Sequence, residues 1–162
     1  MNQQVLEAKQ SVVKEIVEKA GAAQSITIAE YRGLTVAQLQ ELRRALRKED
    51  AELCVYKNSL VARAVKELGY VGVDEVLAGP NAIIFSKELS NGPKIVNKYS
   101  KRFGNVLSVK GGVVEGKFVD AKGMIEVAKM PGREGLISMF LSCLQAPVRQ
   151  FACAVQAVAD AK

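Results

Sequence analysis

Grouped arginines and lysines are the side chains of this sequence whose type and spacing best suit a defined chemistry. Arg43, Arg44 and Arg47 fall within about 100° of arc on a predicted helix, and no acidic residue stands four positions from any of them. Such a cluster is either a solvated charged face or a surface for a polyanion. The net charge of +6, to which no histidine contributes, favours a polyanion such as a phosphate backbone.

Two predicted strand-to-helix turns add further cations. Tyr31-Arg32-Gly33 forms the first turn and Lys57-Asn58-Ser59 the second, and Arg63 follows one turn into the second helix. Each turn places a basic residue where the backbone N–H groups of a helix start are unpaired, which is a ready anion site. Glycine at position 33 would let another backbone approach closely. We predict that both turns lie at one edge of a sheet and form a phosphate-binding surface with the three arginines.

The absence of histidine disfavours several kinds of enzyme. The chain lacks the most common general base and the most common transition-metal ligand, and no Cys-x-x-Cys pair replaces them. We therefore expect no metal site, no Ser-His-Asp triad and no cofactor. Cys54, Cys143 and Cys153 are scattered through apolar stretches, which predicts reduced cysteines in the core of a cytosolic protein.

One stretch has part of the pattern of a phosphate-binding loop. The run from Gly111 to Lys117 fits G-x-x-x-x-G-K, but Phe118 stands where that loop needs a serine or threonine for magnesium. The loop also needs a helix that starts at the lysine, whereas the following residues read as strand or turn. Nucleotide hydrolysis therefore stays an alternative, and the sequence favours a protein that is not an enzyme.

These residues are positioned by alternating strands and helices. β-Branched and alternating segments, with Gly111-Gly112 as a bulge or tight turn, predict strands at 25–31, 53–56, 80–86, 106–109 and 113–115. Helices are predicted at 2–21, 93–103 and 120–129. A further helix should begin at a capping box formed by Thr35 and Gln38, and another should run from the N-cap Asn58 to Gly69. Leu39, Leu42 and Leu46 should face inward from the second helix.

Two β-α-β units in series predict an α+β fold, a small sheet with helices packed against it. The step Met130-Pro131-Gly132 breaks the chain after these units. We expect the domain boundary there, with a globular domain at 1–132 and a separate helix at 133–162. A chain of 162 residues is long enough for one ordinary domain and such an appendage.

The C-terminal helix is almost entirely apolar. From Gly135 onwards, only Arg149, Asp160 and Lys162 are charged. A heptad repeat with Phe140 beside it forms an apolar stripe of Ile137, Phe140, Leu141, Leu144, Val148, Phe151, Val155 and Val158. The repeat stays in phase across Pro147, which predicts one long helix, kinked near Pro147 and about 40 Å long.

The apolar stripe could be covered in three ways. The helix could pack on its own domain, dock onto helices of a partner, or associate with a membrane by crossing it or lying on its surface. Gln145, Pro147, Arg149 and Gln150 interrupt the run, whereas a membrane span needs about 20 mostly apolar residues. The lysine-rich polar face of a helix that lies on a membrane is missing as well, so both membrane modes are disfavoured.

Short motifs spread along the chain carry a resemblance to a known family. They are Tyr31-Arg32-Gly33-Leu34-Thr35-Val36, Glu41-Leu42-Arg43-Arg44, Lys57-Asn58-Ser59-Leu60, Gly79-Pro80, Lys110-Gly111-Gly112, Glu115-Gly116, Met130-Pro131 and Leu144-Gln145-Ala146-Pro147. In this order they resemble the bacterial large-subunit ribosomal proteins that form the base of the stalk. The resemblance covers essentially the whole chain.

The resemblance implies a cytoplasmic protein that is a structural constituent of the large ribosomal subunit. In that family the N-terminal domain binds large-subunit ribosomal RNA beside a neighbouring large-subunit protein. The long C-terminal helix anchors dimers of a small acidic stalk protein, and these dimers recruit translational GTPases. The family also represses translation of its own message, so an RNA-binding repressor that acts off the ribosome is the alternative function.

The resemblance also implies site residues. The RNA-side motifs of the family match Tyr31, Arg32, Gly33, Arg43, Arg44, Lys57, Asn58 and Ser59, and we add Arg47 and Arg63 from their predicted positions. Domain 1–132 would then bind RNA, and the apolar stripe in 133–162 would bind the acidic dimers in a short helical bundle. Because the helix is short, we expect two dimers.

Overall fold

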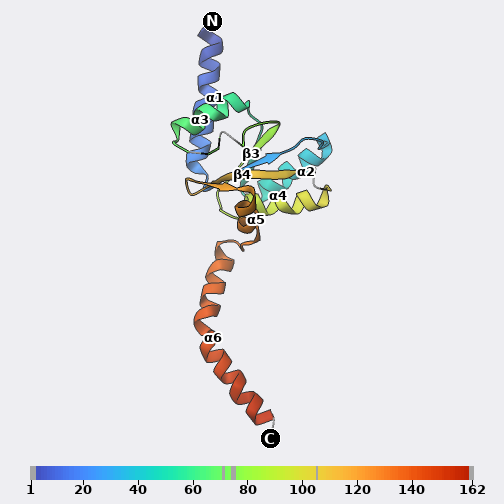
Figure 1. The fold of residues 1–162 in the computed structure, drawn as a ribbon, viewed down its shortest axis with the longest axis vertical. Coiled ribbons are helices and arrows are strands. Elements are labelled where there is room, and N and C mark those ends of the chain that lie inside the picture. Colours follow the sequence, from blue (N-terminus) through green and yellow to red (C-terminus); the bar gives the residue numbers. More distant parts are fainter. Residues whose placement is uncertain (1–2, 71, 74–75, 105, 161–162) are drawn as a thin grey trace. The chain divides into compact units, whose positions relative to one another are not determined.

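The computed structural model of the chain describes residues 3–70, 72–73, 76–104 and 106–160, the side chains of 4–6 excepted. The chain divides into two compact units, Met1–Met130 and Pro131–Lys162 (Figure 1). Asn2, at the start of the first predicted helix, and Lys162, at the end of the predicted apolar helix, lie outside the described residues.

The first unit is built on a five-stranded sheet with the order β2-β3-β1-β4-β5. The strands are β1 (Ser25–Glu30), β2 (Ala51–Cys54), β3 (Asn81–Ser86), β4 (Ser108–Val114) and β5 (Lys117–Asp120). Strands β1 and β2 run parallel with β3 between them, and β3 and β4 run parallel with β1 between them. The α+β prediction is confirmed, and neighbouring strands are antiparallel because the two β-α-β units interlock.

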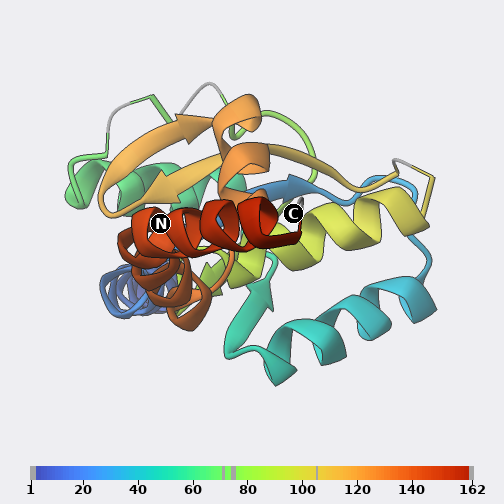
Figure 2. The same cartoon turned by 90° about the horizontal axis from the view of Figure 1, so that it is seen from below.

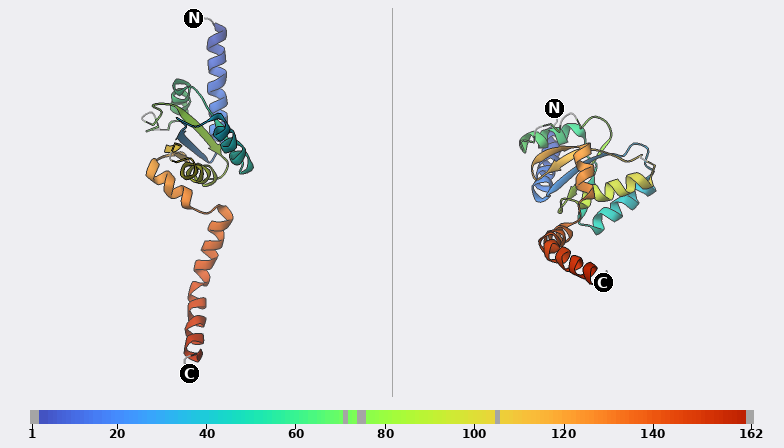
Figure 3. Two further views of the ribbon diagram at one scale, coloured as in Figure 1. Left: turned by 90° about the vertical axis from the view of Figure 1, so that its right-hand side faces the viewer. Right: turned by 60° about the horizontal axis from the view of Figure 1, so that its bottom comes forward.

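Helices cover both faces of this sheet (Figure 1). On one face lie α1 (Gln3–Ala22) and α3 (Asn58–Glu67). On the other face lie α2 (Val36–Lys48) and α4 (Asn91–Arg102), with α5 (Ala121–Lys129) packed beside α4. The N-terminal half of α1 extends beyond the rest of the first unit (Figure 3), and Glu7 to Ser11 are exposed there.

The sheet separates two apolar cores, and β3 contributes to both. Every residue of β3 is buried; Ile83 and Phe85 face the core under α1 and α3, whereas Ile84 faces the core under α2 and α4. Leu42 and Leu46 of α2 are fully buried, as the sequence predicted, and each such side chain stabilises the fold by about 1.5–3 kcal/mol. Leu39 is only half-buried.

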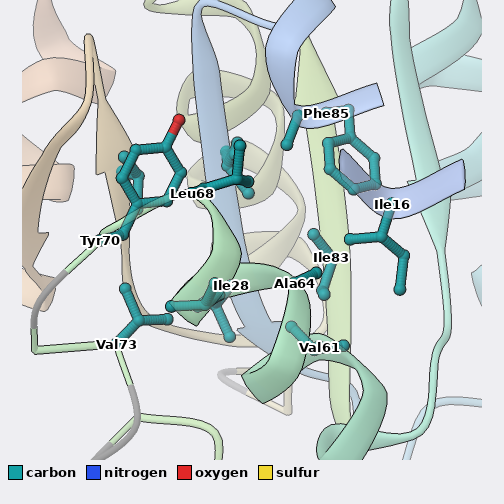
Figure 4. Close-up of a pocket in the computed structure, with 13 residues that line it drawn as sticks. Ile16, Ile28, Val61, Ala64, Leu68, Tyr70, Val73, Ile83 and Phe85 are labelled. Carbon is teal, nitrogen blue, oxygen red and sulfur yellow. The ribbon is translucent and has the colours of Figure 1, made fainter. Parts of the chain in front are cut away.

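The core under α1 and α3 encloses a cavity of about 30 Å³ (Figure 4). Aliphatic and aromatic side chains line it, among them Ile16, Val61, Tyr70 and Phe85. A water molecule fits in a space of this size only where polar partners hold it. The walls offer none, so the cavity is a packing gap rather than a ligand site.

The helix ends lie within two residues of the predicted ones, but one predicted cap is wrong. The Gln38 amide donates to Thr35 Oγ1 at 3.4 Å and the Thr35 amide to Gln38 Oε1 at 2.9 Å, which confirms the capping box. Gly69 ends α3 with φ of +73°. Asn58 was predicted as the N-cap of α3, and this is wrong, because the extended cap conformation falls on Lys57. Asn58 is the first helical residue instead.

The Gly111–Lys117 run forms a β-hairpin. Ile28 pairs with Gly111 and Ala29 with Val109, so Lys110 bulges out of an otherwise continuous β4. The tight turn lies at Glu115-Gly116, with φ of +49° and +80°, and Lys117 opens β5. Lys117 is followed by strand, and the next helix, α5, begins only at Ala121. This contradicts a phosphate-binding loop at these residues and with it the nucleotide alternative.

The second unit is a single helix, α6 (Arg133–Asp160). It continues through Pro147, as predicted, and changes direction midway along its length (Figure 1). None of its residues is buried. Cys143 and Cys153 are therefore exposed and Cys54 is half-buried, so the expectation of three core cysteines is wrong. None of the helices in the described part of the chain has the length and apolar character that crossing a membrane requires.

Candidate nucleic-acid interface

The two basic turns lie at the same edge of the sheet, which we call the strand-end edge. Tyr31-Arg32-Gly33 follows β1 and Lys57-Asn58-Ser59 follows β2, and these strands are parallel. Strands β3 and β4 begin at this edge, since Glu30 pairs with both Asn81 and Ser108. The antiparallel order therefore gathers two helix starts and two strand starts in one place.

Two side chains fix the segment between the basic turns. Lys110 Nζ lies 3.0 Å from Glu30 Oε2 and donates to the Ala78 carbonyl at 2.7 Å. The Asn58 amide donates to the Gly79 carbonyl at 2.8 Å. Lys110 thus has its charge neutralised inside the protein. It positions the strand-end edge. The sequence predicted a bulge or tight turn at Gly111-Gly112, and the bulge lies one residue earlier, at Lys110.

The first turn presents Arg32 outwards, whereas Tyr31 packs inwards. Gly33 has φ of +92°, and a Cβ there would lie 3.0 Å from Val106 Cγ1. Its close neighbour is therefore a side chain of the same unit. Tyr31 is half-buried and packs on the core under α2 and α4, so its ring is not free to stack fully on a base. Arg32 is exposed.

The two helix starts differ in what they offer an anion. The start of α2 is closed by its own capping box. The start of α3 has no side-chain cap, and Lys57 and Ser59 are exposed beside it. Unpaired N–H groups and the positive end of the helix dipole favour an anion there. Of the two turns, the second is the better phosphate site.

The predicted arginines do not join the turns in one patch. Arg43 is half-buried and Arg44 and Arg47 are exposed on α2, whereas Arg63 is exposed on α3 across the sheet. Arg47 lines a groove of about 290 Å³ with Lys87, at the edge opposite the strand-end edge. The ten residues that the sequence selected therefore lie in several places around the first unit.

A cluster of ionisable side chains beside that groove ties α1 to the sheet. Lys19 pairs with Glu15 at 3.0 Å and with Glu52 at 3.1 Å, and the Tyr56 hydroxyl donates to Glu15. The hydrogen bond to Glu15 raises the pKa of Lys19, and burial raises the pKa of the Cys54 thiol. A paired lysine and a protonated thiol fit a structural role rather than a reactive one.

Unpaired cations on an α+β domain, followed by a helix that cannot bury its own apolar stripe, define a protein that works within a larger assembly. A family model described as ribosomal protein L10 matches residues 4–103, and one described as ribosomal protein uL10 C-terminal region matches 130–162. The chain therefore belongs to the ribosomal protein L10 family.

Relatives of nearly the same length support this. The chain is 48% identical over 159 residues to the large ribosomal subunit protein uL10 of Shouchella clausii (strain KSM-K16), which covers 98% of this chain and 95% of the relative. It is 47% identical, with the same coverage, to the protein of that name from Bacillus cereus (strain B4264). The protein is a structural constituent of the large ribosomal subunit in the cytoplasm, and it is not an enzyme.

Proposed function

We propose that the first unit binds large-subunit ribosomal RNA and that α6 anchors dimers of an acidic stalk protein. A neighbouring large-subunit protein would lie beside the first unit, and the dimers would recruit translational GTPases. The observation that carries the proposal is the apolar stripe on α6. Phe140, Val148 and Phe151 are 65%, 75% and 73% exposed, which is unusual for side chains of this size.

A helix alone cannot cover a stripe of this kind. Burial of each large apolar side chain contributes about 1.5–3 kcal/mol, so helices that pack along the stripe would bind with a large favourable free energy. The heptad spacing suits the knobs-into-holes packing of such a bundle. The stripe therefore supports docking of partner helices as the function of α6.

Pro147 divides the stripe into two similar segments. Ile137, Phe140, Leu141 and Leu144 precede it, and Val148, Phe151, Val155 and Val158 follow it. Proline removes one backbone hydrogen bond and bends the helix, so the two segments face partners in different directions. One dimer for each segment gives the two dimers that we propose.

The RNA half of the proposal is supported by charge. Salt bridges in the described ranges involve Lys19, Arg102 and Lys110 among the cations. Arg32, Arg44, Arg47, Lys57 and Arg63 are exposed and take part in none of them. Unpaired surface cations are available to replace the counterions of a phosphate backbone. The excess of positive charge therefore favours RNA over an uncharged partner.

The stalk half of the proposal is tested by a matched pair of substitutions in α6. Phe151→Asp places a carboxylate on the apolar stripe, and Gln156→Asp places one on the exposed face beside it. An unpaired carboxylate among partner helices is strongly unfavourable, so Phe151→Asp should weaken binding of the acidic protein on the order of 100-fold. Gln156→Asp should change it little. Native mass spectrometry counts the bound copies, and equal losses in both variants would contradict the stripe as the docking surface.

Lys110 gives a test of the strand-end edge. Lys110→Met leaves the Glu30 carboxylate unpaired and frees the Ala78 carbonyl, so the free energy of unfolding should fall by about 1–3 kcal/mol. RNA binding should weaken because the segment at 78–80 is no longer held. Since Lys110 is paired with Glu30 inside the protein and does not contact a phosphate, the salt dependence of binding should keep its slope.

The control for Lys110 is Lys117→Met, which removes an exposed lysine from the neighbouring strand. It should leave the free energy of unfolding unchanged within about 0.5 kcal/mol. Chemical denaturation measures the stability, and RNA titration at several salt concentrations measures the slope. A slope that falls by about 0.7–0.9 in Lys110→Met would show that Lys110 contacts a phosphate directly.

A further inference from the structure

We propose that the groove between α2 and α4 is a second phosphate-binding surface, which takes the sugar–phosphate backbone of RNA. The inference rests on the proposed RNA-binding function and adds three cations that the sequence did not select, Lys48, Lys94 and Lys98. We call this surface the α2–α4 groove. Two hollows of about 430 and 210 Å³ make it up, and they share Glu49, Ile95 and Lys98.

The groove runs along two helices that pack side by side (Figure 2). Helix α2 leads from the end of β1 to the start of β2, and α4 leads from the end of β3 to the start of β4. Because β1 and β3 are antiparallel, the two helices run in opposite directions across the same face of the sheet. Ala45 and Ile95 line the groove between the two helices.

Cations line both walls of the groove. Arg44 and Lys48 stand one turn apart on α2, and Lys94 and Lys98 stand one turn apart on α4. All four are exposed, and within the described ranges none of them takes part in a salt bridge. The positive charge therefore extends along the groove instead of gathering at one point.

The acidic side chains of the groove do not cancel this charge. Glu41 is held by Arg102, which itself lies over the Tyr99 ring at 5.8 Å. Glu49 lines both hollows, beside Lys98 in each of them, and takes part in no salt bridge in the described part of the chain. Four unpaired cations thus face one unpaired carboxylate.

The extended charge fits a polymer of phosphates better than a protein partner. Interfaces with proteins are usually anchored by exposed aromatic or aliphatic side chains that enter a pocket. The large apolar side chains of the groove, Ile95 and Tyr99, are only half-exposed. Lysine and arginine along an open groove bind a nucleic-acid backbone through its phosphates, whatever the base sequence.

The groove also gives the α2 arginines a structural context. Arg44 points to the groove and Arg47 to the separate groove with Lys87. Of the three arginines that the sequence singled out, Arg44 lines the α2–α4 groove, where Lys48 stands beside it and α4 supplies the opposite wall. RNA that follows the groove would lie along the helices, away from the α3 start on the other face of the sheet.

The test is a salt titration of the full-length chain with transcribed large-subunit ribosomal RNA. Lys94→Gln with Lys98→Gln should reduce the slope of log affinity against log salt by about 1.4–1.8, the value for two phosphate contacts. Lys94→Arg with Lys98→Arg keeps the charge and should keep the slope. Lys14→Gln with Lys66→Gln removes two exposed lysines from α1 and α3 and should also keep it. Circular dichroism on heating confirms that each variant folds.

The outcomes separate the groove from the proposed function. If the wild-type chain binds ribosomal RNA specifically and the Lys94/Lys98 glutamine variant keeps the full slope, the groove inference is wrong and RNA binding stands. If the wild-type chain prefers ribosomal RNA no more than an unrelated RNA of equal length, the proposed function fails, and the slope on the unrelated RNA still tests the groove. Loss of acidic-protein binding with an unchanged slope would reassign the groove to a protein and overturn the inference.

Discussion

A chain that ends at Gly132 is expected to fold, to stay soluble and to lose the acidic dimers completely. Unit Met1–Met130 contains both apolar cores and the whole sheet. Removing α6 therefore takes away none of the residues that form these two cores. Its affinity for ribosomal RNA should stay within a few-fold of the full-length value, because α6 carries little charge. The full-length chain alone should aggregate, since the apolar stripe faces water, and the acidic protein should prevent this.

Gel filtration, circular dichroism and native mass spectrometry with the acidic protein measure these outcomes. A second chain that ends at Ala146 is the graded control, because it keeps the half of the stripe before Pro147. It should bind half as many copies as the full-length chain. If the chain ending at Gly132 unfolds by itself, the apolar stripe belongs to the core of the first unit, and docking of partner helices on α6 is the wrong function.

Replacement of Arg43, Arg44 and Arg47 by alanine is expected to weaken binding to ribosomal RNA and to flatten its salt dependence. Each lost phosphate contact should lower the slope by about 0.7–0.9, so three contacts would lower it by about 2.1–2.7. Arg43 is half-buried, and a loss nearer two contacts would show that it serves packing instead. The drop in affinity should be largest at low salt, where counterion release is most favourable.

The matched control replaces Lys14, Lys66 and Lys129 by alanine, three exposed cations on α1, α3 and α5. The net charge changes by the same amount, but the slope should remain. Thermal unfolding of both variants guards against a loss of fold. A full slope in the arginine variant would place RNA elsewhere on the first unit, with the uncapped start of α3 as the next surface to examine.

Local signals in the sequence were sufficient for most of the helices and strands. The Thr35–Gln38 capping box formed because its two hydrogen bonds join residues three positions apart. Gly69 ended α3 because glycine takes a positive φ without steric cost. The apolar stripe of α6 and its continuity through Pro147 follow from a spacing that is visible in the sequence alone. The family resemblance rested on motifs of this local kind.

Contacts between distant segments were decided only by the tertiary structure. Asn58 bonds to Gly79 rather than capping its own helix, and Lys110 turns inward to Glu30 because a bulge in β4 aims it there. The strand order places Arg63 across the sheet from the α2 arginines, and it brings Lys98 beside Arg44 and Lys94 beside Glu49. Periodicity determines which face of a helix is buried, but which helices share a face depends on how the strands pair across the whole domain.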